Sequence, residues 1–451
     1  MLFSSFEFLF RFLPVFLVIY YLTPKKFRNV TLLGGSIVFY TIGEAGYITI
    51  LLACVLVNYT LTRLMYRKST DGRGIRQKRL LLLALGYDLG VLFFFKYSGL
   101  ASGLPLGISF YTFQIMAYVI DVYRGKYSVC RSFTEVAAYI SMFPQLIAGP
   151  IVSFDEVRPQ LEKRRVTVKN IEWGIMLFVV GLVYKVLFAN KIASLWNDVM
   201  TVGVMGADTA LVWLGAWGYA MQIYFDFFGY SLMAMGIGKL LGFNFPGNFL
   251  SPYCAVSVTD FWRRWHITLG RWFREYVYIP LGGNKKGRAR MVLNTFVVWL
   301  LTGLWHGAAW NFIIWGMFFF VLITAEKLLY GKLLERHRVV GHIYMMLIIP
   351  FSWVIFNITD LGELKLYLCR MLGGIGLPAA LGDAVGKSVS LMGRYWWLLI
   401  ICAVCSTPIP MKLITKHRNS IVVKIVLLLL FWLCVYQLSI QKSNPFLYFR
   451  F

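Results

Sequence analysis

Residues 291–325 read MVLNTFVVWLLTGLWHGAAWNFIIWGMFFFVLITA, 35 residues without one Asp, Glu, Lys or Arg. Basic clusters flank this stretch: Lys285, Lys286, Arg288 and Arg290 before it, and Lys327, Lys332, Arg336 and Arg338 after it. Because Lys and Arg mark the cytoplasmic ends of spanning segments, both flanks belong on one side of a membrane. The stretch therefore predicts a helical hairpin. Each arm has about 15 residues, or about 22 Å of helix, which holds His306 within the hydrocarbon slab, towards its outer half.

The composition extends this membrane interpretation to the whole chain. Of the 451 residues, 59% are apolar and only 14% are charged, whereas a soluble protein carries roughly 25% charged residues. These values exclude a disordered protein, a disulfide scaffold and a soluble dinucleotide-binding enzyme. The 45 Lys and Arg exceed the 20 Asp and Glu by 25. We assign this excess to cytoplasmic loops and not to nucleic-acid binding.

Twelve apolar segments approach the roughly 20 residues that a membrane-crossing helix needs. They are Phe6–Leu22, Asn29–Ile42, Tyr47–Thr62, Leu80–Phe95, Ile108–Val122, Ile171–Ala189, Ala210–Phe227, Met291–Trp305, Asn311–Ala325, Ile343–Ile358, Tyr395–Pro408 and Ile421–Ile440. Basic clusters follow the first and third segments, whereas the turn between the second and third carries only Glu44. This alternation places the N-terminus outside. The sequence predicts one integral-membrane domain over residues 1–451, without an internal repeat.

The stretch Val136–Val152 breaks the alternation. Both of its flanks are basic, yet its 17 residues suffice for one crossing and not for two. Proline and glycine interrupt it at Pro144, Gly149 and Pro150. Either the segment is a re-entrant element that dips into the membrane and returns, or it is a plain kinked helix.

The segment Val258–Arg290 combines aromatic and basic residues. Its apolar side chains recur at spacings of three and four: Trp262, Trp265, Leu269, Trp272, Phe273 and Tyr276. This period predicts a helix lying at the cytoplasmic membrane surface, with Asp260 as its N-cap. Arg263, Arg264 and Arg271 on its polar side are candidate contacts for phosphate groups, although a solvated basic face explains them nearly as well.

Two histidines stand out as candidates for chemistry. An ionisable group at membrane depth is a functional hypothesis by default, which favours a catalytic role for His306 over hydrogen-bonded helix packing. His266 falls on the aromatic stripe and points inward, where composition alone favours a structural role. Cys402 and Cys405 lie in an apolar segment and read as helix core. No metal site or phosphate-loop pattern is recognisable, so no metal or bound cofactor is expected.

Several long motifs, in order, resemble the membrane-bound O-acyltransferase superfamily, and most closely its bacterial branch of polysaccharide O-acetyltransferases. They are Phe3–Leu22 (FSSFEFLFRFLPVFLVIYYL), Pro105–Lys126, Phe143–Ile151 (FPQLIAGPI), Tyr224–Tyr253, Phe261–Gly287, Gly303–Gly316 (GLWHGAAWNFIIWG) and Asn444–Phe451 (NPFLYFRF). The likeness is densest over residues 105–316.

The resemblance implies an all-α polytopic membrane protein: a ring of about 11 to 13 transmembrane helices, with re-entrant or interfacial helices and a central tunnel. It also implies acyl transfer from a thioester. In the family the histidine of the W-H-G motif, here His306, is catalytic, and His266 occupies the second polar position. We take Arg263, Arg264, Arg271, Trp305 and Asn311 as the candidate substrate-binding residues.

We therefore expect an O-acetyltransferase of the bacterial plasma membrane. It would pass acetyl from cytosolic acetyl-CoA across the membrane to O-acetylate a surface or secreted polysaccharide, with an extracytoplasmic acetyltransferase as partner. His306 would act as general base, and His266 would donate to the oxyanion or orient the donor. Two alternatives stay open: a D-alanyl transferase of teichoic acids that uses a carrier-protein thioester, and a transporter without chemistry.

Overall fold

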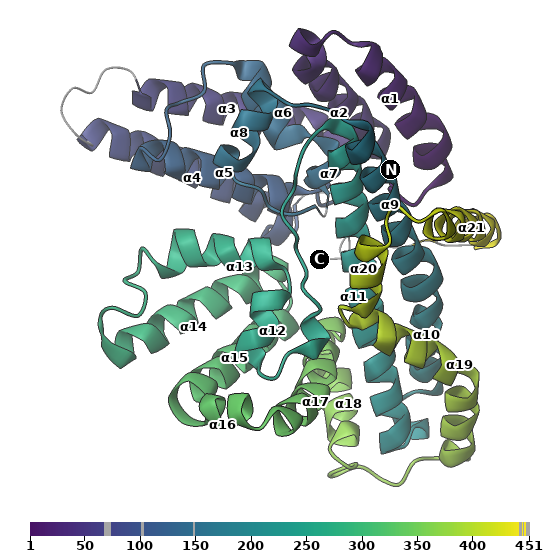
Figure 1. Ribbon diagram of the computed structural model, residues 1–451. Helices are drawn as coiled ribbons and strands as arrows, with labels where there is room; N and C mark the ends of the chain where they lie inside the picture. The colour runs from purple at the N-terminus through teal and green to yellow at the C-terminus, as the bar shows by residue number, and fades with distance from the viewer. Residues whose placement is uncertain (67–73, 101–102, 148, 442–443, 445, 448–451) are drawn as a thin grey trace. The chain divides into compact units, whose positions relative to one another are not determined.

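The computed structural model describes residues 1–66, 74–100, 103–147, 149–441, 444 and 446–447. Within these ranges the chain consists of helices and turns, with no strand (Figure 1). Seven helical stretches in the described ranges are long and apolar enough to cross a membrane: Lys25–Met65, Ile75–Tyr97, Val168–Val202, Trp310–Arg336, Arg338–Asn357, Ala384–Ser406 and Ile421–Ile440. The chain is thus an all-α polytopic membrane protein, and each of the twelve predicted segments falls on a helix to within a few residues.

The chain divides into two compact units, each described here by itself. Unit 1 comprises Met1–Val179 and Tyr230–Gly247, and unit 2 comprises Val180–Gly229 and Asn248–Phe451. Two of the three boundaries fall inside helices, namely α9 (Val168–Val183) and α11 (Thr209–Leu241), and the third falls in the loop between Gly247 and Asn248. The single domain of the sequence analysis stays a prediction.

Unit 1 is built mainly from the N-terminal helices. They are η1 (Glu7–Phe12), α1 (Leu13–Leu22), α2 (Arg28–Glu44), α3 (Ile48–Tyr66), α4 (Ile75–Tyr97), α5 (Ile108–Arg124), α6 (Phe133–Ser141), α7 (Phe143–Leu146) and α8 (Phe154–Glu162). Phenylalanine rings fill its core, where Phe143 packs edge-on against Phe12 and Phe16, with ring centroids 5.4 and 5.2 Å apart.

The stretch Val136–Val152 is broken, and a continuous kinked helix is excluded. Helix α6 ends at Ser141, the next residue, Met142, has a non-helical ψ of 120°, and α7 follows with only four residues. The two ends of this stretch come back together, as shown by the hydrogen bond that the Tyr139 hydroxyl donates to the carbonyl oxygen of Val152 at 2.8 Å. This reversal is the shape expected of a re-entrant element. Ala148 in the same motif lies outside the described residues.

Unit 2 carries the remaining helices. They are η4 (Tyr184–Ala189), α10 (Asn190–Val202), α12 (Val258–Arg264), α13 (Ile267–Phe273), η7 (Arg274–Tyr278), α14 (Gly287–His306), α15 (Trp310–Ala325), η8 (Glu326–Tyr330), α16 (Gly331–Arg336), α17 (Arg338–Asn357), α18 (Leu361–Met371), α19 (Ala384–Ser406), α20 (Ile409–Lys416) and α21 (Ile421–Ile440). Both candidate histidines and all the candidate substrate-binding residues lie in this unit.

A buried ion pair anchors the C-terminal segment within unit 2. Lys185 Nζ lies 2.6 Å from Asp226 Oδ1, and both side chains are almost fully buried. The other carboxylate oxygen of Asp226 accepts a hydrogen bond from the backbone N–H of Leu447 at 2.8 Å. A buried charge needs such partners, so the pair fixes where the chain end docks.

Candidate active site

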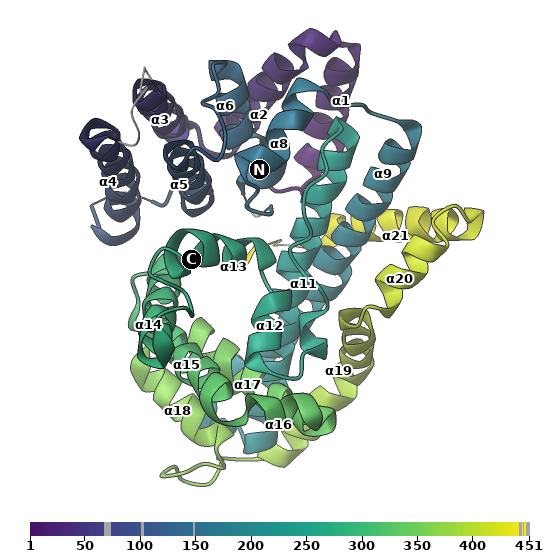
Figure 2. The ribbon, with the colours of Figure 1, turned by 60° about the vertical axis from the view of Figure 1, so that its left-hand side comes forward.

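His306 is the last residue of α14, at the tip of the predicted hairpin. Helices α14 and α15 lie side by side (Figure 2) and make the most extensive helix–helix contact among the described elements, which confirms the hairpin. The first arm is longer than expected, because α14 begins at Gly287 within the basic cluster. Its 20 residues span about 30 Å, close to the thickness of the hydrocarbon core.

Two glycines allow the arms to pack this closely. A Cβ atom at Gly316 would lie 2.4 Å from the carbonyl oxygen of Trp299, and one at Gly303 would lie 2.5 Å from that of Phe312. Any side chain at either position would push the backbones apart. The glycines therefore set the distance between the helices and the place of the turn that carries His306.

Aromatic rings surround the imidazole of His306. Its ring centroid lies 4.8 Å from Trp305, 5.1 Å from Trp315 and 4.9 Å from Phe356, at interplanar angles between 75° and 84°. Only 6% of the residue is exposed. The orientation of this ring is therefore set largely by the shapes of its neighbours.

His266 sits at a break in the chain. The predicted continuous helix through residues 258–276 was wrong: α12 ends at Arg264, Trp265 is extended, and α13 begins at Ile267. His266 itself has φ 45° and ψ 51°, a left-handed conformation that is unfavourable for a residue with a side chain. Such strain persists only where the surroundings enforce it, and it clusters at functional sites.

The predicted N-cap of α12 was also wrong. Ser257 caps the helix, because its hydroxyl accepts from the backbone N–H of Asp260 at 3.0 Å. The Asp260 carboxylate instead binds Arg264, with Oδ1 2.8 Å from Nε. This ion pair engages one of the three arginines that the sequence suggested for phosphate contacts.

Asn248 clamps the strained residue, and sequence reasoning missed it. Its backbone carbonyl accepts from the N–H of Ile267 at 3.0 Å. Its side-chain Oδ1 lies 3.1 Å from the backbone nitrogen of Thr268, 3.0 Å from the Thr268 hydroxyl and 3.3 Å from His266 Nδ1. Asn248 is 18 residues upstream of His266, so no local spacing could reveal the pairing.

His266 and His306 share one aromatic neighbour. The Trp305 ring lies 6.3 Å from the His266 ring and 4.8 Å from the His306 ring, centroid to centroid. The two imidazole centroids therefore cannot be further apart than the sum of these distances, about 11 Å. His266 is only 2% exposed, and burial lowers its pKa to about 3. The ring is thus neutral at physiological pH.

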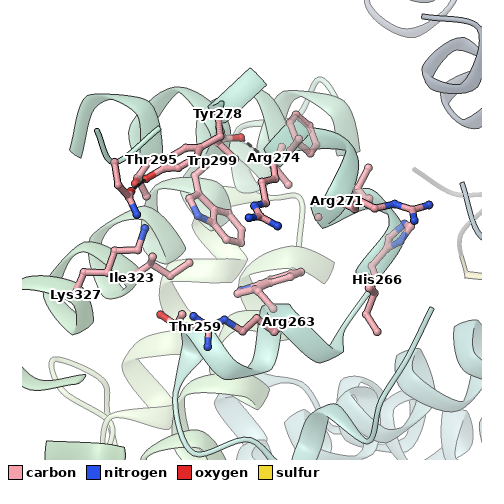
Figure 3. Close-up of a pocket in the computed structure, with 18 residues that line it drawn as sticks. Thr259, Arg263, His266, Arg271, Arg274, Tyr278, Thr295, Trp299, Ile323 and Lys327 are labelled. Atoms are coloured by element: carbon pink, nitrogen blue, oxygen red, sulfur yellow. Dashed lines mark hydrogen bonds between the residues drawn. The ribbon is translucent and has the colours of Figure 1, made fainter. Parts of the chain in front are cut away.

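A cavity of about 600 Å³ opens beside His266 (Figure 3). Its basic lining residues are Arg263, Arg271, Arg274 and Lys327, and its large aromatic ones are Trp262, Phe273, Tyr278 and Trp299. None of its lining residues, all within the described ranges, is acidic. The basic lining gives the cavity a positive potential that favours a polyanionic ligand, and the rings offer faces on which a flat group could stack.

Only some of the candidate residues line this cavity. His266, Arg263 and Arg271 line it, whereas His306, Trp305, Asn311 and Arg264 are not among its lining residues. Arg274 and Lys327, which the sequence analysis passed over, do line it. In Figure 3, Arg274 extends into the middle of the cavity from η7, and Lys327 comes from η8.

Asn311 connects two helices. Its Nδ2 donates to the carbonyl oxygens of Ile355 at 3.2 Å and Phe356 at 2.7 Å. These bonds fix the start of α15 against the end of α17, where the carbonyl groups lack helical partners. The contact supports the Phe356 ring against His306, while substrate binding by Asn311 stays a prediction.

Glu326 holds the start of α12, and no pattern in the sequence pointed to it. Its carboxylate accepts from the backbone N–H of Val258 at 2.6 Å and from the N–H of Thr259 at 2.8 Å. It also accepts from the Thr259 hydroxyl at 2.6 Å. A negative group at a helix N-terminus satisfies otherwise unpaired N–H donors, so Glu326 fixes the helix that presents Arg263.

Comparison with known proteins supplies the family context. The model of the membrane-bound O-acyltransferase family matches residues 37–359. A probable alginate O-acetylase of Pseudomonas putida is 34% identical, with both chains covered completely. A peptidoglycan O-acetyltransferase of Helicobacter pylori is 33% identical over 83% of this chain and 80% of its own. A teichoic acid D-alanyltransferase of Bacillus subtilis is 29% identical over 49% of this chain and 58% of its own.

Proposed function

Because the chain belongs to the membrane-bound O-acyltransferase family, we propose that it is an O-acetyltransferase of a bacterial plasma membrane. It takes acetyl from cytosolic acetyl-CoA and passes it across the membrane for the O-acetylation of a surface or secreted polysaccharide. The relatives that match this chain at full or nearly full length act, by their names, on alginate and peptidoglycan. An extracytoplasmic acetyltransferase would complete the transfer.

The observation that carries the proposal is the basic cavity beside His266. Coenzyme A bears three phosphate groups and a flat adenine, and the cavity offers cations and aromatic faces to match. Its volume of about 600 Å³ lies within the range of small-molecule sites, roughly 300–1,000 Å³. Arg263, Arg271, Arg274 and Lys327 would bind the phosphates, and the thioester would extend from there towards His266.

Acyl transfer from a thioester requires a base for the acceptor hydroxyl. The hydroxyl oxygen bonds to the carbonyl carbon, the carbon–sulfur bond breaks, and the hydroxyl proton passes to the base and then to the departing thiolate. We assign this base to the pair His266 and His306, which share Trp305 as an aromatic neighbour, with His306 as the primary residue. General base catalysis contributes typically 10²–10⁴-fold.

Turnover of labelled donors by the purified protein tests the proposal. We expect release or transfer of labelled acetyl from acetyl-CoA by the parent and none by His306→Ala. A D-alanyl transferase would instead discharge a D-alanyl carrier-protein thioester and leave acetyl-CoA intact, and the similarity to a D-alanyltransferase over half of the chain makes this the second candidate. A transporter would leave both thioesters uncleaved. Either result would overturn the proposal.

A further inference from the structure

The backbone of Asn248–Leu250 runs against that of Arg264–Ile267. The N–H of Leu250 donates to the carbonyl oxygen of Arg264 at 2.9 Å, and the N–H of Ile267 donates to that of Asn248 at 3.0 Å. His266 lies between these two bonds. The two bonds hold the backbone on either side of His266 and so enforce its left-handed conformation. The strain is thus maintained by the pairing of these two segments, which places the His266 side chain.

The hydrogen bonds of Asn248 identify its side-chain oxygen. The oxygen and nitrogen of a side-chain amide are distinguished by their hydrogen-bond partners. The atom assigned as Oδ1 accepts from a backbone N–H, that of Thr268 at 3.1 Å, and a backbone N–H can only donate. The atom is therefore the oxygen, since a nitrogen there would place two donors face to face.

This identification fixes the proton on His266. An amide oxygen cannot donate, so in the 3.3 Å contact between His266 Nδ1 and Asn248 Oδ1 the imidazole nitrogen is the donor. A neutral imidazole carries one proton. With that proton on Nδ1, the lone pair is on Nε2.

We infer that Asn248 is a positioning residue that holds His266 with its proton on Nδ1, so that Nε2 acts as a proton acceptor in the acetyl transfer. The inference rests on the proposed function and changes one part of it. In this tautomer Nε2 has no hydrogen to offer a developing oxyanion, so the donor role expected for His266 from the sequence is withdrawn. Arg271, which lines the same cavity, is a donor that could take over this task.

The surroundings keep the ring neutral. Phe227 from α11 and Trp305 from α14 face it, with centroids 4.8 and 6.3 Å away. The charged residues that line the adjoining cavity are the cations Arg263, Arg271, Arg274 and Lys327. Burial opposes protonation of the ring and lowers the pKa of His266 to about 3. His266 is thus ready to accept a proton throughout the physiological range.

His266 can therefore serve beside His306, the primary base, as the second base of the histidine pair in the balanced step given above. The acceptor hydroxyl gives its proton to Nε2 as its oxygen bonds to the thioester carbon, and the imidazolium returns that proton to the thiolate when the carbon–sulfur bond breaks. The transient imidazolium remains hydrogen-bonded to Asn248 through Nδ1. No other reactant is needed.

Asn248→Asp tests the inference in the full-length protein. The carboxylate keeps an acceptor for Nδ1–H and adds a negative charge beside the ring, which should raise the pKa of His266 by about 1–3 units. Protonated His266 cannot accept a proton, so the acidic limb of the kcat/KM profile for acetyl-CoA should move to higher pH. Asn248→Leu, which removes the acceptor, should lower kcat about 100-fold or more. An unchanged pH profile in folded Asn248→Asp would overturn the inference.

Two matched variants separate this effect from a structural one. Thr268→Val removes one donor to the same oxygen but leaves the acceptor for Nδ1, and should keep the parent's pH profile. Asn294→Asp buries a carboxylate elsewhere in unit 2, since Asn294 is 1% exposed and bonds to Gly283, and should also keep it. A limb that moves equally in Asn294→Asp would contradict the role of Asn248.

The parent protein offers a second measurement, in case Asn248→Asp does not fold. With ¹⁵N-labelled histidine, the His266 signals, identified by their loss in His266→Gln, should show a protonated Nδ1 and an unprotonated Nε2. The opposite tautomer would overturn the inference even while the parent turns over acetyl-CoA. Absence of turnover in the parent would instead count against the proposed function itself.

Discussion

The hairpin α14–α15 holds His306 through the shapes of its neighbours, whereas the segment around Asn248 holds His266 through hydrogen bonds. The first region is regular helix up to the histidine itself. The position of its imidazole depends on two glycines and on the surrounding aromatic rings. The second is a strained turn between two short helices. Ring contacts define the plane of an imidazole, whereas the hydrogen bond to Asn248 also defines which nitrogen of His266 carries the proton. The two histidines should therefore respond to different substitutions.

The largest expected effect is the loss of His306. His306→Ala should lower acetyl transfer at least 100-fold, because it removes the primary base, while the detergent-solubilised protein keeps its unfolding temperature to within a few degrees. His337→Ala, at an exposed histidine, is the control and should have parental activity. Activity of His306→Ala equal to the parent would remove His306 from the mechanism.

The next largest effect is expected from loss of Glu326, which should weaken binding of the acetyl donor. Glu326→Ala leaves the N-terminus of α12 without its carboxylate, and hydrogen bonds to charged groups are worth about 1.5–3 kcal/mol. We expect KM for acetyl-CoA to rise about tenfold or more, because Arg263 loses its fixed position. Glu326→Gln keeps an acceptor and should recover part of the affinity. Equal KM values in both variants and the parent would show that the cap does not position the site.

A side chain at the glycine contact between α14 and α15 should destabilise the hairpin. Gly316→Ala places a methyl group 2.4 Å from the carbonyl oxygen of Trp299, and overpacking costs about 1–3 kcal/mol. The unfolding temperature should fall, and transfer should fall with it as His306 moves. Gly34→Ala in α2, where no atom lies within 4 Å of the new methyl group, should be neutral or mildly stabilising.

The cavity cations should have smaller, additive effects. Arg274→Ala or Lys327→Ala should raise KM for acetyl-CoA severalfold with little change in kcat, because each removes one contact to a phosphate. Arg264→Ala is the matched control, since Arg264 pairs with Asp260 and does not line the cavity. A KM for Arg264→Ala as high as that for Arg274→Ala would place the phosphates elsewhere.

The smallest effect expected is that of a topology probe. Arg288→Cys, at an exposed position in the first turn of α14, should leave transfer close to parental. In intact cells an impermeant thiol reagent added outside should not modify it. Labelling from outside would reverse the orientation deduced from the basic clusters, and with it the cytosolic entry of the donor.

The hairpin could be predicted from the sequence, because the residues that define it are close together in the chain. A charge-free stretch between basic clusters defines both arms, and Gly307 ends α14 one residue after His306. The same reasoning failed at His266. The helical spacing of Trp262, Trp265 and Leu269 continues through residues 258–276 and predicts one unbroken helix. The chain instead breaks between α12 and α13.

The residues that sequence reasoning missed act across long separations. Asn248 imposes the break from 18 residues upstream, and Glu326 caps α12 from 67 and 68 residues downstream. Neither belongs to a periodic pattern. Arg274 and Lys327 carry charges that any surface residue could carry, and only the cavity distinguishes them from solvated cations.

Trp305 neighbours both imidazoles, and its bulk bears on how much of the donor is lost to water. A thioester donor is lost whenever water reaches it in place of the intended hydroxyl, and a chain of water through a membrane also conducts protons. An indole in contact with both histidines occupies the space that such a chain would need. The size of this one side chain would then set the ratio of useful transfer to wasted hydrolysis, and would help to keep protons from leaking across the membrane.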